Sequence, residues 1–76
     1  MLGTISFLKE FGRKRFWGYV EAKGRHYHFD AHDVTSGSHR VRVGVEVEFE
    51  PISSSNPHVT PKAQDVIVLP LEAEDV

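Results

Sequence analysis

A chain of 76 residues has room for one domain, which must be compact because a chain of this size buries only about 60% of its unfolded surface. It has no cysteine and no apolar run near the ~20 residues of a membrane span, which excludes disulfides, thiolate metal sites and membrane-crossing helices. The formal net charge of −2 conceals a separation of positive from negative residues along the chain. Residues 1–43 carry eight Lys/Arg and four Asp/Glu, whereas residues 44–76 carry one Lys and seven Asp/Glu.

Short β-rich segments separated by turn residues recur along the chain, and nothing reads as a long amphipathic helix. Strands are expected at residues 4–9 (TISFLK), 15–22 (RFWGYVEA), 25–29 (RHYHF), 41–51 (VRVGVEVEFEP) and 63–70 (AQDVIVLP). The connections are expected to be a hairpin loop at 10–14, a turn at 22–24, a long loop with room for one helical turn at 30–40, and a loop of turn formers at 53–61. Five short strands of this kind predict an all-β fold, a small five-stranded antiparallel barrel.

The segment 41–51 has the clearest period of two. One face is predicted to hold Val41, Val43, Val45, Val47 and Phe49. The other is predicted to hold Arg42, Glu46, Glu48 and Glu50. The first face therefore predicts core packing, and the second is too acidic to contact nucleic acid.

The segment 15–30 interleaves rings with charged residues. A period of two places Arg15, Trp17 and Tyr19 on one side of the strand and Phe16, Gly18 and Val20 on the other. His26 and His28 share a face of the next strand, and Phe7 and Lys9 of the first strand can join the same surface. Flat rings flanked by cations are suited to stacking unpaired bases while following the phosphates. A basic face can attract a polyanion even on an acidic protein.

Five fragments in the same order resemble the cold-shock domain family, from about Gly3 to Leu69. GTISFLK is similar to the family's opening segment, RFWGYV to its first ribonucleoprotein motif and HYHFDAH to its second. GVEVEFEP and PKAQDV are similar to its last two strands. The chain departs from the family pattern at His26, where the family has a stacking phenylalanine, and at Phe16, which replaces a glycine.

The resemblance implies an OB-fold barrel that binds single-stranded RNA or DNA with low sequence specificity and acts as a nucleic-acid chaperone. The residues expected to contact bases are Phe7, Trp17, Tyr19, His26, His28 and Phe29. The residues expected to follow the phosphates are Lys9, Arg13, Lys14 and Arg15. The domain is expected to span residues 1–70, followed by a flexible acidic tail at 71–76.

Other classes of function have weaker signals in the sequence. His26, His28 and His32 form an H-x-H-x3-H pattern, but two histidines on a strand lack an assured third ligand, so we expect no metal. No nucleophile has a predictable base, so we expect neither an enzyme, nor a cofactor, nor a small-molecule substrate. A protein-interaction barrel that uses the same aromatic face remains an alternative. The N-terminal residues lack the pattern of a secretory signal, so we expect a soluble, cytoplasmic monomer.

Overall fold

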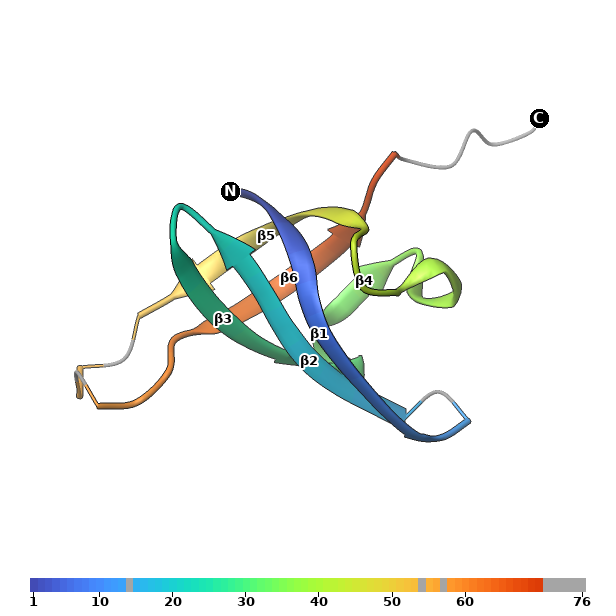
Figure 1. Cartoon of the computed structure of the whole chain (residues 1–76), viewed down its shortest axis with the longest axis horizontal. Helices are drawn as coiled ribbons and strands as arrows, with labels where there is room; N and C mark the ends of the chain where they lie inside the picture. The colour runs from blue at the N-terminus through green and yellow to red at the C-terminus, as the bar shows by residue number, and fades with distance from the viewer. Residues whose placement is uncertain (14, 54, 57, 71–76) are drawn as a thin grey trace.

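The protein is described from a computed structural model, in residues 1–13, 15–53, 55–56 and 58–70. The strands of this part of the chain are β1 (Leu2–Gly12), β2 (Arg15–Ala22), β3 (Arg25–Asp30), β4 (Val34–Ser36), β5 (Glu46–Ile52) and β6 (Lys62–Val68) (Figure 1). Two short 3-10 turns, η1 (Ala31–Asp33) and η2 (Ser38–Arg40), flank β4.

The strands follow the order β3-β2-β1-β5-β6-β4, and a pairing between β3 and β6 closes five of them into a barrel. The predicted all-β, five-stranded barrel is therefore confirmed, with β4 as an additional short strand. The predicted antiparallel pairing is wrong at one place, because the strand pair that closes the barrel, β3 and β6, is parallel and the barrel is therefore mixed. The additional strand β4 also runs parallel to β6, whereas the other pairs are antiparallel. The predicted helical turn in the long loop corresponds to η1, where Asp30 caps the turn by accepting a hydrogen bond from the His32 backbone N–H.

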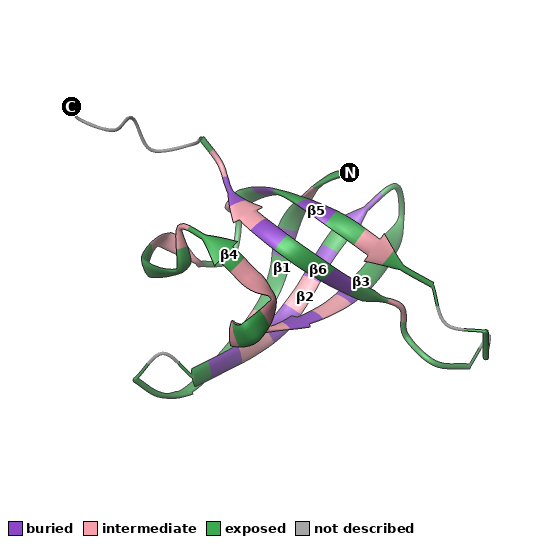
Figure 2. Ribbon diagram, turned by 180° about the vertical axis from the view of Figure 1, so that it is seen from behind, coloured by how far each residue is buried: buried purple, intermediate pink, exposed green. Residues whose placement is uncertain are grey.

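Buried residues alternate with more exposed ones along the strands (Figure 2). The buried residues form an apolar core inside the barrel. In β2, Phe16, Gly18 and Val20 are buried, whereas Trp17 and Tyr19 are only half-buried and point outward, as the sequence predicts. A Cβ added to Gly18 would overlap the backbone carbonyl oxygen of Phe7, so only glycine lets β1 and β2 approach here. The core residues are Ile5, Phe16, Val20, Ala22, Tyr27, Phe29, Val47, Phe49, Ala63, Val66 and Val68.

A bulge in β1 decides which of its side chains reach the surface. Ile5 lies opposite Val20 and Phe7 lies opposite Tyr19, so Ser6 is an extra residue in the ladder. The bulge reverses the alternation, and Ile5 is therefore completely buried while Phe7, two residues later, is 44% exposed.

The strands differ from those predicted in three main respects. β1 continues to Gly12 through what was expected to be a hairpin loop, and β4 lies within the predicted long loop. The predicted strand 41–51 begins only at Glu46, because Gly44 adopts a positive φ of 96° and turns the chain. Val43 is consequently 60% exposed, and its predicted place in the core is wrong. The predicted tail at 71–76 lies outside the described residues.

Candidate nucleic-acid interface

Pairing across β1, β2 and β3 brings five rings to one face of the barrel, which we call the ring face: Phe7, Trp17, Tyr19, His26 and His28. Phe7 lies opposite Tyr19, and Tyr19 lies opposite His28. The Trp17 ring centroid lies 5.4 Å from that of Phe7 and 5.7 Å from that of His28. The Tyr19 centroid lies 6.1 Å from Phe7, 5.8 Å from His28 and 6.3 Å from His26. The rings therefore form one continuous aromatic surface across three strands.

The ring face is accessible to a ligand. Phe7 and His26 are exposed, and Trp17, Tyr19 and His28 are half-buried. One shallow hollow lies among Phe7, Trp17, Tyr19 and His26, and a second lies among Trp17, Tyr19 and His28. The two hollows share Trp17 and Tyr19, so a flat ligand bound in one would adjoin a ligand bound in the other. Such neighbouring platforms suit successive bases of one strand.

Phe11 extends the ring face, and the sequence reasoning missed it. Glu10 lies opposite Phe16 and Gly12 lies opposite Arg15, so Phe11 is the extra residue of a second bulge in β1. Its side chain is 56% exposed and lines the same hollow as Trp17 and His28. If the first strand had been predicted to continue beyond residue 9, a period of two would have placed residues 7, 9 and 11 on the same face. Gly12 instead favoured the prediction of a loop at this point.

The cations expected to follow phosphates lie at one end of the ring face. Lys9 is exposed opposite Trp17, and Arg15 and Arg13 are exposed where β1 and β2 meet. Lys14 lies outside the described residues. At the opposite end of the face, Glu21 lies opposite His26.

The structure corrects the assignment of Phe29 to the binding surface. Phe29 has no exposed surface, and its ring packs in the core with its centroid 6.3 Å from that of Phe16. Its neighbour two residues earlier, Tyr27, is also buried, so both side chains follow the inward half of the β3 alternation. The prediction that Phe29 contacts bases rested on the resemblance to the family motif. The period of two along the strand instead points its side chain inward.

The three histidines of the H-x-H-x3-H pattern lie on two elements: His26 and His28 belong to β3, and His32 belongs to η1. His32 is exposed, and its Nδ1 lies 3.7 Å from a carboxylate oxygen of Asp30. Among the residues that the structure describes, no group of three or more His, Cys, Asp or Glu side chains is placed to hold a metal ion. Within the same residues, no helix has the length and apolar character to cross a membrane.

Comparison with protein-family models, curated proteins and solved structures finds no match to this chain. The resemblance to cold-shock domains therefore rests on the sequence fragments alone. The barrel and the geometry of its ring face are independent of that resemblance.

Proposed function

We propose that the protein binds single-stranded RNA or DNA with low sequence specificity and acts as a nucleic-acid chaperone. The observation that carries the proposal is the continuous, accessible ring face over β1, β2 and β3. In proteins that bind single strands on aromatic side chains, each stacked base contributes about 1–3 kcal/mol of binding free energy. Lys9 and Arg15 beside the rings supply positive charge for the phosphates.

Two polar groups near the rings already make hydrogen bonds within the protein, and this favours low specificity for base sequence. The Ser6 hydroxyl donates a hydrogen bond to the backbone oxygen of Tyr19, at 3.4 Å. The Asp30 carboxylate accepts the backbone N–H of His32 at 2.9 Å and so caps η1. These groups already have partners within the protein, whereas the rings offer a π surface to any base. Stacking therefore outweighs the reading of base edges, and a protein that holds unpaired strands shifts hairpins toward the open form by mass action.

The test is a competition between a hairpin and an unstructured strand of matched length at ~50 mM salt, where the ionic contribution is strong. The unstructured strand is expected to bind more tightly, because duplex bases hide the faces that the rings would stack on. An abasic strand of the same length is the control, since it keeps the phosphates and removes the bases. Equal or tighter binding to the hairpin, or no binding to either, would contradict the proposal.

Salt dependence separates this function from a protein-interaction surface, which the exposure of Phe7 and Phe11 also suits. Binding of a single strand should weaken with salt at a logarithmic slope of about −0.7 per phosphate contacted. Arg15→Gln is expected to make the slope shallower by ~0.7, because one phosphate contact is lost. Arg42→Gln, a matched loss of charge outside the ring face, should leave the slope unchanged. A slope near zero would favour the protein-interaction alternative.

A further inference from the structure

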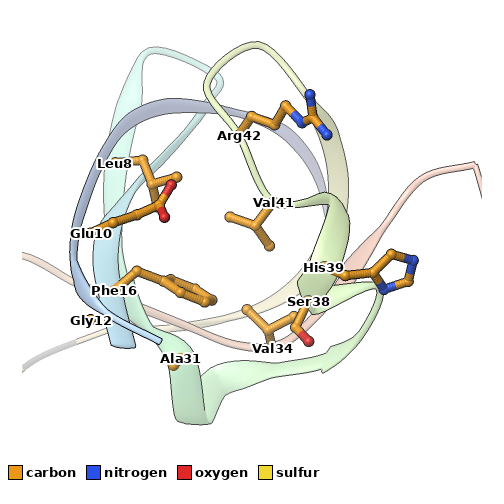
Figure 3. Close-up of a pocket in the computed structure, with 10 residues that line it drawn as sticks. All are labelled: Leu8, Glu10, Gly12, Phe16, Ala31, Val34, Ser38, His39, Val41 and Arg42. Carbon is orange, nitrogen blue, oxygen red and sulfur yellow. The ribbon is translucent and has the colours of Figure 1, made fainter. Parts of the chain in front are cut away.

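A cavity of about 600 Å³ opens at one end of the barrel, between the β1–β2 hairpin and the segment 31–42 (Figure 3). Its apolar lining consists of the side chains of Leu8, Phe16, Ala31, Val34 and Val41. Four of these are only partly buried against the core, and the fifth, Phe16, belongs to it. The core therefore has an accessible apolar surface at this end of the barrel.

The cavity follows from the irregular chain between β3 and β5. In the described part of the chain, the elements between β3 and β5 are the short turns η1 and η2 and the short strand β4, with no long helix among them. Gly37 and Gly44 adopt positive φ angles of 80° and 96°, which turn the segment away from the regular barrel ladder. Val41 still points into the space (Figure 3). A ligand that covered these apolar groups would recover the burial that the fold leaves incomplete.

The charged and polar side chains around the cavity differ in direction: some point into it and others point away. The Glu10 carboxylate points into the cavity beside Leu8, whereas the guanidinium of Arg42 and the ring of His39 point away from it (Figure 3). Among the described residues, Glu10 has no hydrogen-bond or ion-pair partner. The charge that faces the interior is therefore negative, and it adjoins an apolar wall.

We propose that this cavity binds a small molecule with an aromatic or other apolar body and one protonated amino group. The apolar body would lie against Phe16 and Val41, and the ammonium would donate hydrogen bonds to the Glu10 carboxylate. The volume falls within the range of about 300–1,000 Å³ that is common for small-molecule sites, which include the mouths of barrels. Phe16 also lines a hollow of the ring face, but Trp17 and Tyr19 are not part of this cavity.

The test is an NMR titration of the full chain with three probes of the same ring system: 2-naphthylmethylamine, the neutral 2-naphthylmethanol and the anionic 2-naphthoate. The amine is expected to shift the methyl signals of Leu8, Val34 and Val41. It should bind about twofold to fivefold more tightly than the alcohol, because Glu10 is exposed and an exposed charge pair adds a modest contribution. The anion should bind most weakly, because Glu10 repels it.

Two variants locate the site. Glu10→Gln keeps the shape of the side chain and should abolish the preference for the amine, whereas Glu48→Gln, the same change on β5 outside the cavity, should retain it. Val41→Trp places a bulky ring in the cavity against the apolar wall and should weaken binding of the amine and the alcohol. Shifts centred on Trp17 and Tyr19, equal binding of the anion, an unchanged preference in Glu10→Gln, or no shifts at ~1 mM probe would each overturn the proposal. Strand binding at the ring face is measured separately with oligonucleotides, so failure of this proposal is distinguishable from failure of the proposed function.

Discussion

Phe29→Ala is expected to lower the free energy of unfolding by about 3–5 kcal/mol. Phe29 is fully buried at the centre of the core, and its removal leaves a cavity that the surrounding strands cannot close. Small domains have little stability to lose, so the variant should be substantially unfolded in water. The measurement is urea denaturation followed by far-UV circular dichroism. Phe29→Leu, a smaller change of volume, should keep enough folded protein for a midpoint to be measured.

Phe7→Ala is the matched control, because it removes the same side chain from a position that is 44% exposed. Phe7→Ala should change the free energy of unfolding only slightly, and it should instead weaken the binding of single strands. A similar loss of stability in both variants would show that Phe7 is a packing residue rather than part of a binding surface. Full stability of Phe29→Ala would contradict its place in the core.

Strands with strict alternation could be predicted from the sequence. In β2, small or apolar residues alternate with Trp17 and Tyr19, and the observed burial follows that period. The inward direction of Val47 and Phe49 in β5 was predictable for the same reason. In both strands the period of two reflects backbone geometry alone, so tertiary contacts did not need to be known.

The bulges of β1 could not be predicted, because a bulge depends on how two strands pair. Ser6 has no local feature that marks it as an extra residue, yet it decides that Ile5 is buried and that Phe7 reaches the ring face. Gly44 had a visible signal, since a glycine within a strand pattern can mark a turn. The regularly spaced valines on either side of Gly44 favoured one continuous strand, and the prediction followed them.

The ring face was largely predictable, whereas the cavity was not. Trp17, Tyr19 and His28 lie together because neighbouring antiparallel strands bring residues on the same face into contact, and the sequence indicates both the strands and the faces. The cavity joins Leu8 and Phe16 to Val34 and Val41, which are far apart in the sequence. Their proximity depends on the path of an irregular loop, for which the sequence has no periodic signal.

Trp17→Ala is expected to weaken the binding of a single-stranded oligonucleotide by about 1–3 kcal/mol, or roughly 5-fold to 150-fold in Kd. Trp17 lies at the centre of the ring face, within 5.4–5.7 Å of Phe7, Tyr19 and His28, and it lines both hollows. Its loss would therefore remove a stacking platform from two neighbouring positions. The measurement is fluorescence anisotropy of a labelled strand, because the variant lacks the chain's single tryptophan.

Trp17→Phe separates stacking from other contributions, since it keeps an aromatic ring at the same place and should restore most of the affinity. In the unmodified protein, the fluorescence of Trp17 should be quenched as the strand binds, which gives a second signal from the same ring. Because Trp17 is half-buried and outside the core, Trp17→Ala should remain folded. If it unfolds, the ring serves mainly to hold β1, β2 and β3 together. If it folds and binds the strand with unchanged affinity, the bases do not stack on this face, and the phosphates alone would have to account for binding.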